Sequence, residues 1–362
     1  MHESKIKILL VNTGIFFICL LIIEIIFGYW FSKDNLGPYM REHRMKKNPT
    51  VLVYENDTFN FVYKRNYYGF RGEEIDPSEI KAVILGGSTT DERYKPEEFT
   101  ITENLNFLLK KKGYDFKIIN AGLQGQSSYG HIYNFQHWFS RLKNFSPELY
   151  IFYIGINDQW TEPDRPENDW NGLGLGFVKS PVALDAFFDN IKSRSFFADK
   201  LRILKQKYYL TSKKIKHDHD YFYGEDGTKN KIINNYEYIN YEKALEIHDI
   251  EYLKSKHQKR ISNYLNNIKI LNNYARSNGA VPVFVTQVRY DGLKVGNIFI
   301  LNYSLIEYCK KRNLNCIDLG KKLNGKLEYW YDIVHTTKLG SKIVAETIIN
   351  DLAKIIKNEN LF

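Results

Sequence analysis

From residue 79 onward, the chain alternates between short apolar runs and segments with helical periodicity. Five apolar runs end in turn signals, a pattern typical of buried strands. They are KAVILGG (81–87), FKIINAG (116–122), ELYIFYIG (148–155), VPVFVTQ (281–287) and NCIDL (315–319). The segments between and after them predict helices near 98–112, 128–144, 256–277, 300–312 and 337–357. Because strands that alternate with helices build parallel sheets covered on both faces, we predict an α/β three-layer sandwich over residues 79–362, with a mostly parallel, flavodoxin-like sheet of five strands.

The N-terminal segment is set apart by a continuous apolar run. Residues 8–31 are 24 positions long and almost entirely apolar, and at about 1.5 Å per residue they span roughly 36 Å, enough to cross a bilayer with some tilt. A cleaved signal peptide is the alternative, but the run lacks an Ala-x-Ala-like site and is longer than a typical signal core. We predict one transmembrane helix within a retained anchor, residues 1–31, followed by a connector and a short strand region, residues 32–78.

The orientation of this anchor is not decided by charge, since basic residues flank both ends of the span. Short N-terminal tails of signal anchors usually stay in the cytoplasm, and Tyr29 with Trp30 suits the outer interface. We therefore expect the body of the protein on the extracytoplasmic side. Glu24 is costly inside a span. It indicates either a membrane protein partner or a position near the interface, where the carboxyl can protonate or reach water.

Composition excludes several classes of protein. In 362 residues, 43% hydrophobic and 15% aromatic content allows a sizeable core and excludes wholesale disorder. Three cysteines are too few and too widely spaced for a disulfide framework or a Cys-rich zinc site. Cys309 and Cys316 could pair in an exported domain, but one is predicted in a helix and the other in a strand, so we expect free buried thiols. The formal charge of +9 identifies no partner by itself, and we expect no nucleic acid partner.

Polar residues follow the carboxyl ends of the predicted strands, where parallel sheets place their active sites. Ser88, Gly122 and Asn157 follow the first three strands, and Asp332 with His335 precedes the last helix. A serine needs a base to take its proton, and a histidine base needs a third group to fix its tautomer. The pattern predicts a catalytic triad of Ser88, Asp332 and His335. Backbone N–H groups of Ser88 and Gly122, with the side chain of Asn157, are the candidate oxyanion donors.

Taken in order, the motifs GGST, NAGLQG, GIND and DIVH resemble the four sequence blocks of the SGNH (GDSL-type) hydrolase superfamily. The resemblance covers roughly residues 80–355 and implies the SGNH form of the sandwich, an esterase or acyl-transfer activity, and Ser88 as nucleophile. No metal or organic cofactor is needed for this chemistry. Gly87 stands where the family usually has aspartate, and glycine fits the sharp turn that presents the serine.

Each signal also has a structural explanation when it is taken alone. The Gly-Gly-Ser turn could cradle a phosphate, although neither common phosphate-binding glycine pattern is present. Asp332 with His335 could cap a helix, and Asn157 with Asp158 could form a loop. Their joint occurrence at strand ends favours catalysis. We expect Asp158 to brace the loop that holds Asn157.

A long segment, about 159–280, separates the third and fourth predicted strands, and we interpret it as a helical insertion. It begins beside Asn157, so Trp160 and Trp170 are candidate substrate-binding residues, with plain loop packing as the alternative. Residues 200–276 hold 16 Lys/Arg and 9 Asp/Glu, a net of +7. This stretch could face acidic lipid headgroups or an anionic glycan, but a solvated pair of Lys-rich helices is the favoured interpretation.

Two histidine pairs are candidate metal ligands. His131 and His137 are six apart on a predicted helix and therefore lie on different faces. His217 and His219 lie in a charged loop, for which solvation is the simpler explanation. We expect no metal site.

Together, these features predict a membrane-anchored serine esterase that hydrolyses an O-acyl ester, with acetyl the leading candidate, on an envelope glycan or lipid. His335 would act first as base and then as acid. Acyl transfer, in which a sugar hydroxyl replaces water, stays open as an alternative. A non-catalytic binding module of the envelope is the third hypothesis, and the intact set of triad and oxyanion residues argues against it.

Overall fold

The computed structural model describes residues 2–31, 44–47, 61–161, 191–192, 194–211 and 236–361. Its centre is a sheet of five strands, and these strands are β3 (Ala82–Gly86), β4 (Ile118–Asn120), β5 (Leu149–Tyr153), β6 (Val281–Val285) and β7 (Asn315–Ile317). The spatial order is β4-β3-β5-β6-β7, and every neighbouring pair is parallel. This is the flavodoxin-like order, so the predicted fold class is confirmed.

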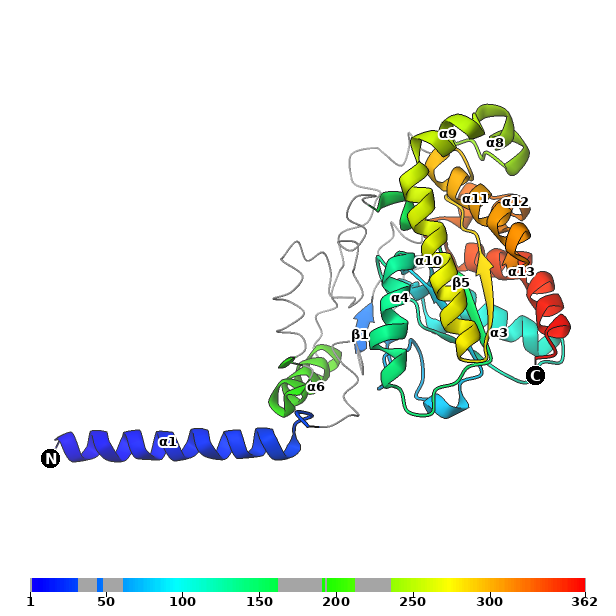
Figure 1. Ribbon diagram of the computed structural model, residues 1–362. Coiled ribbons are helices and arrows are strands. Elements are labelled where there is room, and N and C mark those ends of the chain that lie inside the picture. The colour runs from blue at the N-terminus through cyan, green and yellow to red at the C-terminus, as the bar shows by residue number, and fades with distance from the viewer. Residues whose placement is uncertain are drawn as a thin grey trace.

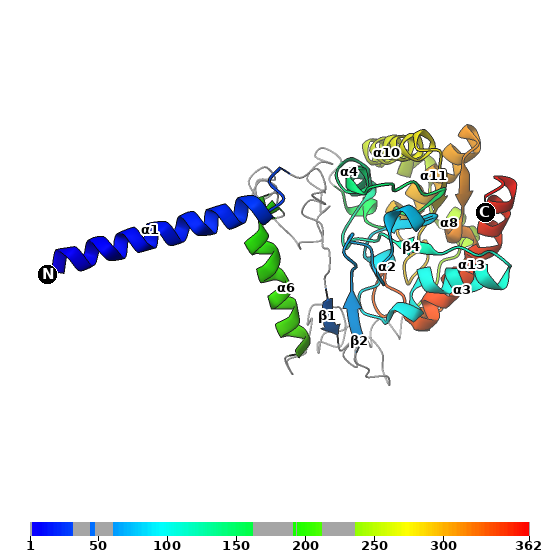
Figure 2. The ribbon, with the colours of Figure 1, turned by 90° about the horizontal axis from the view of Figure 1, so that it is seen from below.

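Helices cover both faces of this sheet (Figure 1). One face carries α3 (Ile101–Lys111) and α13 (Lys338–Asn358), and the other carries α4 (Ser128–His137), α10 (Gln258–Ser277) and α11 (Gly296–Arg312), as Figure 2 shows. Successive strand residues point to opposite faces. Accordingly, Ala82 and Ile84 of β3 join the core under α3 and α13, whereas Val83 and Leu85 join the core under α4 and α10.

Local capping sets where several of these helices begin and end. Thr100 accepts a hydrogen bond from the Glu103 backbone N–H and starts α3, and Thr337 does the same for Gly340 at the start of α13. Asn313 has a φ of 52° and closes α11 in the left-handed conformation that asparagine tolerates. The five predicted helices are therefore present, with boundaries that follow these caps.

Shorter elements connect the layers. They are α2 (Ser88–Asp91), α8 (Tyr241–Ile247), α9 (Ile250–Lys256), α12 (Leu319–Lys322) and five 3₁₀ turns at Pro77–Glu79, Glu97–Phe99, Phe139–Arg141, Asp158–Trp160 and Leu327–Tyr329. The α10 helix lies in the core through Tyr264, Ile268 and Leu271. The sandwich therefore resumes at residue 258 and not at 280, where the sequence placed the end of the insertion.

A long helix, α1 (His2–Phe27), extends away from the sandwich (Figure 1). Its segment Lys5–Phe27 contains an 18-residue window with a mean hydropathy of 2.6 and is long and apolar enough to cross a membrane. Near its end lies α6 (Phe196–Thr211), and between α6 and the sandwich lies an antiparallel pair, β1 (Arg44–Lys47) and β2 (Phe61–Lys64), as Figure 2 shows. The β2 strand belongs to the strand region that the sequence predicts after the anchor.

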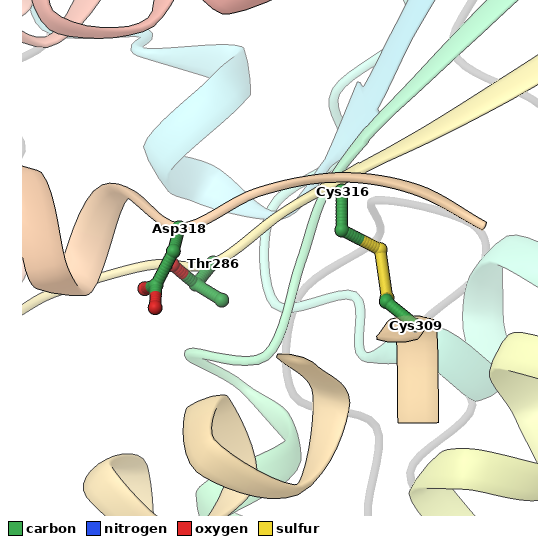
Figure 3. The surroundings of a disulfide bond; sticks show 4 residues. All are labelled: Thr286, Cys309, Cys316 and Asp318. Carbon is green, nitrogen blue, oxygen red and sulfur yellow. A yellow bond between two sulfur atoms is a disulfide. The ribbon is translucent and has the colours of Figure 1, made fainter. Parts of the chain in front are cut away.

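The prediction of free thiols at Cys309 and Cys316 is wrong, because the two form a disulfide (Figure 3). Cys309 is near the end of α11 and Cys316 is in β7. The turn at Asn313 reverses the chain between them, so their Cα atoms lie 6.3 Å apart, within the range that a disulfide requires. A helix position and a strand position become neighbours here because the connection is so short. In the same view, Thr286 donates a hydrogen bond to Asp318 at 3.1 Å.

Candidate active site

Ser88 stands at the first position of α2, directly after β3. Two glycines make this turn sterically feasible. A Cβ on Gly86 would lie 2.6 Å from the backbone oxygen of Tyr153, and one on Gly87 would lie 2.2 Å from Asn157 Nδ2. A side chain at position 87 would therefore displace the Asn157 amide. Gly87 therefore leaves the space that the Asn157 amide occupies in this chain.

His335 and Asp332 reach Ser88 from a distant part of the sequence. His335 Nε2 lies 2.7 Å from Ser88 Oγ, and its Nδ1 lies 2.6 Å from Asp332 Oδ2. The other carboxylate oxygen of Asp332 accepts the backbone N–H groups of Val334 at 2.8 Å and His335 at 2.7 Å. The structure therefore brings the three predicted triad residues into one hydrogen-bonded chain. The side chain of Asp332, at the inner end of this hydrogen-bonded chain, is fully buried, and the imidazole of His335 is 14% exposed.

The loop around His335 is fixed on both sides. Trp330 and Thr336 form an antiparallel bridge, and the Tyr331 backbone N–H donates to the backbone oxygen of His335 at 3.0 Å. The Tyr331 ring stacks on the imidazole with 5.6 Å between the ring centres and 9° between the planes. These contacts hold the imidazole in the plane in which one ring nitrogen meets Asp332 and the other meets Ser88.

Asn157 lies beside the serine turn, after β5. Its Nδ2 donates to the backbone oxygen of Gln126 at 2.8 Å. An amide nitrogen carries two hydrogens, so one remains available next to the turn that presents Ser88. The following residue, Asp158, is buried and accepts the Ser128 backbone N–H at 3.1 Å, as well as the Ser128 hydroxyl. Asp158 thereby ties this loop to the start of α4 and braces it, as the sequence predicts.

Burial changes the acidity of the Asp158 carboxyl group. The pKa of Asp158 rises to about 6, because desolvation of the buried carboxylate outweighs the hydrogen bonds from Ser128. The Asp158 carboxylate bonds to Ser128 at the start of α4 and not to a residue of the triad. We therefore assign it a structural place.

The backbone N–H of Gly122 has a different partner from the one that the sequence suggests. Its backbone N–H donates to Asn120 Oδ1 at 2.9 Å, and a Cβ at this position would lie 2.4 Å from the backbone nitrogen of Asp91. Gly122 therefore packs against the back of α2, and its donor already has a partner. The predicted role as an oxyanion donor does not fit this arrangement, which leaves the Ser88 N–H and the Asn157 amide as the candidate donors.

A buried ionic cluster lies behind α2, and sequence reasoning missed it. Asp91 is fully buried and accepts hydrogen bonds from Tyr63 at 2.7 Å and Arg65 at 2.9 Å. Arg65 also donates to the backbone oxygen of Gly122 at 3.0 Å. Burial alone would raise the pKa of Asp91, but the guanidinium groups of Arg65, Arg93 and Arg71 outweigh it and hold the pKa below its usual value.

Arg71 extends this cluster toward the rest of the sandwich. It donates to the backbone oxygens of Asp91 and Lys95, the latter at 2.7 Å, and pairs with Glu97 at 2.9 Å. Both arginines come from the strand region before the domain, for which the sequence analysis predicts no chemical role. The available signal was the placement of Arg65 and Arg71 within a stretch rich in aromatic residues, because arginines are buried only when they are paired.

A second buried pair connects the serine turn to the histidine loop. Lys95 and Glu92 are almost completely buried and lie 2.7 Å apart. Lys95 Nζ also donates to the backbone oxygen of Thr336 at 2.6 Å and to the Ser341 hydroxyl. Glu92 follows α2 directly, and Thr336 follows His335. The pair therefore fixes the two segments that bring Ser88 and His335 together.

Of the two predicted substrate-binding tryptophans, Trp160 is 51% exposed and lies one turn after Asn157. Its backbone N–H donates to the backbone oxygen of Asn157 at 3.0 Å, so its position depends on that loop. Trp170 lies outside the described residues, as do His217 and His219. Within the described ranges, no group of three or more His, Cys, Asp or Glu side chains could hold a metal ion.

The fold and the site together have the arrangement of a serine hydrolase, with the nucleophile candidate at the point where the strand order reverses. The chain resembles the SGNH (GDSL-type) hydrolases in the order of its motifs and in the geometry of Ser88, Asp332 and His335.

Comparison with solved structures found similar folds. A GDSL-like lipase from Bacteroides thetaiotaomicron is 14% identical, with 78% of this chain and 92% of that chain covered and a TM-score of 0.37. The psychrotrophic esterase EstA from Pseudoalteromonas is 11% identical, with 76% and 98% covered and a TM-score of 0.43. A variant of Axe2, an acetyl-xylooligosaccharide esterase from Geobacillus, is 12% identical, with 76% and 96% covered and a TM-score of 0.40.

At these identities the similarity concerns the fold, and the activities of those proteins are not transferred to this chain. No protein-family model matches the sequence, and no curated protein matches it.

Proposed function

We propose that this protein is a membrane-anchored serine esterase that cleaves O-acyl esters of an envelope glycan or lipid. The observation that carries the proposal is the continuous hydrogen-bonded chain from Ser88 through His335 to Asp332. A buried aspartate, a histidine with both ring nitrogens engaged and a partly exposed serine hydroxyl are the three parts that nucleophilic acyl transfer requires.

The chemistry follows from these positions. Ser88 Oγ attacks the ester carbonyl while His335 Nε2 takes its proton, and Asp332 stabilises the imidazolium that forms. The Ser88 backbone N–H and the Asn157 amide donate to the developing oxyanion. His335 then gives its proton to the departing alkoxide, which leaves an acyl group on Ser88. Water, activated by the same imidazole, attacks the acyl-enzyme and releases the acid.

Two features support a catalytic domain on the extracytoplasmic side of a membrane. The α1 helix is long and apolar enough to span a bilayer. The Cys309–Cys316 disulfide suits an oxidising compartment, since disulfides are rare in the reducing cytosol. An envelope component is the substrate class that an anchored domain in this position would meet. The exposed Trp160, one turn after Asn157, supports a glycan substrate because tryptophan rings stack on apolar sugar faces.

The test uses the full chain, purified in detergent, with p-nitrophenyl acetate as substrate. We expect Ser88→Ala to abolish hydrolysis while Ser140→Ala, which changes an exposed serine in the 3₁₀ turn Phe139–Arg141 after α4, leaves the rate unchanged. Undiminished hydrolysis by the Ser88 variant would remove the proposed nucleophile. Adding a saturating sugar acceptor to the wild-type reaction separates hydrolysis from transfer. Release of acetate as the main product supports hydrolysis, and an acetylated sugar as the main product contradicts it.

A further inference from the structure

Glu24, the carboxyl group within the apolar helix α1, caps the start of α6. Its carboxylate accepts the backbone N–H groups of Phe196 at 3.0 Å and Phe197 at 3.2 Å, and its Oε1 also accepts the Trp30 indole N–H at 3.0 Å. A carboxylate at a helix N-terminus satisfies donors that have no partner within the helix. The sequence left the partner of Glu24 open, and in the structure that partner is another helix of the same chain.

Further contacts make this junction specific. The Tyr29 backbone N–H donates to the backbone oxygen of Arg194 at 2.8 Å, and the Arg194 guanidinium donates to the backbone oxygen of Trp30 at 3.1 Å. The rings of Phe27 and Phe196 lie 5.7 Å apart. Glu24 is three residues before the end of α1, or about 4.5 Å along the helix axis. If α1 crosses a bilayer, α6 must therefore begin at the membrane boundary.

The outer face of α6 carries apolar side chains. Leu201, Leu204 and Tyr208 are 66%, 61% and 67% exposed, and their spacing of three and four residues places them in one stripe. Exposed lysines lie on both sides of this stripe, at positions 200, 205 and 207. On the other side of the helix, Asp199 and Arg202 pair at 2.6 Å and are largely covered.

We propose that α6 is an interfacial helix that lies in the headgroup layer of the membrane that α1 crosses. The stripe of Leu201, Leu204 and Tyr208 would enter the outer acyl region, and the flanking lysines would extend to lipid phosphates. Figure 2 shows α6 running crosswise to α1, which is the direction that such a helix requires. The proposal rests on the anchoring role of α1 and is independent of the esterase chemistry.

This placement has a consequence for the domain. A single span leaves an attached domain free to rotate, whereas a second contact in the membrane plane fixes one face toward the lipid. The α6 helix contacts β1, β1 pairs with β2, and β2 holds Tyr63, which bonds Asp91 behind Ser88. A continuous series of contacts thus connects the proposed membrane surface to the serine turn.

The test measures membrane depth in the full chain, reconstituted into vesicles of phosphatidylcholine and phosphatidylglycerol. Leu204→Cys in a Cys19→Ser background is labelled with an environment-sensitive fluorophore, and quenching by lipids spin-labelled near the headgroup is recorded. With Cys19 replaced by serine and Cys309 paired with Cys316, the new cysteine at position 204 carries the one reactive thiol. Phe107→Cys in the same background is the matched control, because Phe107 is an exposed apolar residue of α3 on the sandwich.

We expect a blue-shifted emission and several-fold stronger quenching at position 204 than at position 107. Labelled wild-type Cys19, measured with lipids spin-labelled near the end of the acyl chain, serves as the check on the anchor, because it lies within the apolar run of α1. Quenching at Cys19 with no difference between positions 204 and 107 would overturn the interfacial helix and leave the anchor intact. Absence of quenching at Cys19 would overturn the anchor and the α6 proposal together, without bearing on hydrolysis by Ser88.

Discussion

The serine turn and the α6 helix place their side chains in opposite ways. Behind Ser88, three buried cationic side chains each pair with a carboxylate: Arg65 with Asp91, Lys95 with Glu92 and Arg71 with Glu97. On α6, apolar side chains point outward from the protein. Buried charges and exposed apolar stripes are both unusual in folded proteins. The charged groups behind Ser88 find their partners within the chain. The apolar stripe of α6, according to the proposal, is covered by the membrane.

This difference indicates where each region obtains its stability. Burying Asp91 and Lys95 removes both from water, and only their partners make that burial tolerable. Asp91 pairs with Arg65, 26 residues away. Lys95 pairs with the nearby Glu92 and also donates to Thr336 and Ser341, so satisfying this charge fixes the serine turn against the histidine loop. The α6 face instead obtains its stabilisation from lipid, according to the proposal.

Among changes around Ser88, Asp332→Asn should have the largest effect on activity. Asparagine keeps the size of the side chain but presents a donor or a neutral acceptor to His335 Nδ1, so the correct tautomer is lost. We expect kcat to fall by about 10⁴-fold, by analogy with the corresponding change in serine proteases. Steady-state hydrolysis of p-nitrophenyl acetate measures this, with Asp351→Asn, at a partly exposed position of α13 that pairs with Lys322, as the control. A loss below tenfold would show that Asp332 does not orient the imidazole.

Lys95→Met should give a smaller effect on activity and a large one on stability. The change leaves Glu92 buried without its cation, and breaking such a pair costs about 3–5 kcal/mol. In contrast, Lys81→Met breaks a pair with Glu148 that is exposed to solvent, for which we expect about 1 kcal/mol or less. Thermal unfolding of both variants measures the difference. Equal shifts would contradict the distinction between a buried, site-forming pair and an exposed one.

Lys95 is a positioning residue in this account, and a second measurement separates that role from stability alone. At a temperature where the variant is fully folded, we expect kcat to fall by roughly 10- to 100-fold with KM unchanged, because a small misplacement of His335 relative to Ser88 slows the chemical step. Adding Glu92→Gln should recover part of the stability and none of the rate. A folded Lys95→Met variant with normal kcat would leave the pair with a structural role only.

Much of the sandwich could be predicted because its signals are local. The strands from Ala82 and Val281 are continuous apolar runs, and their turns contain glycine or polar residues. Ser88, Asp332 and His335 lie together as the sequence predicts, since parallel strands end at one sheet edge. Their catalytic roles remain predictions until they are tested.

The features that sequence reasoning missed depend on tertiary contacts or on the local path of the backbone. The Gly122 N–H turns toward Asn120, which spacing alone does not reveal. Arg65 is buried because it meets Asp91, 26 residues further along the chain. The Cys309–Cys316 pairing depends on the direction in which the chain turns at Asn313. The partner of Arg65 is distant in the sequence, whereas the contacts of Gly122 and Cys309 follow from the local path of the backbone, which residue types alone do not determine.

Covalent labelling tests the central claim most directly. An activated phosphonate transfers its phosphonyl group to a serine hydroxyl only where a base takes the proton, so the site of modification reports which hydroxyl is activated. We predict a single adduct on Ser88, located by peptide mass spectrometry of the full-length protein, and no adduct in the His335→Ala variant. An adduct on another residue, or equal modification with and without His335, would contradict the claim that this imidazole activates this serine.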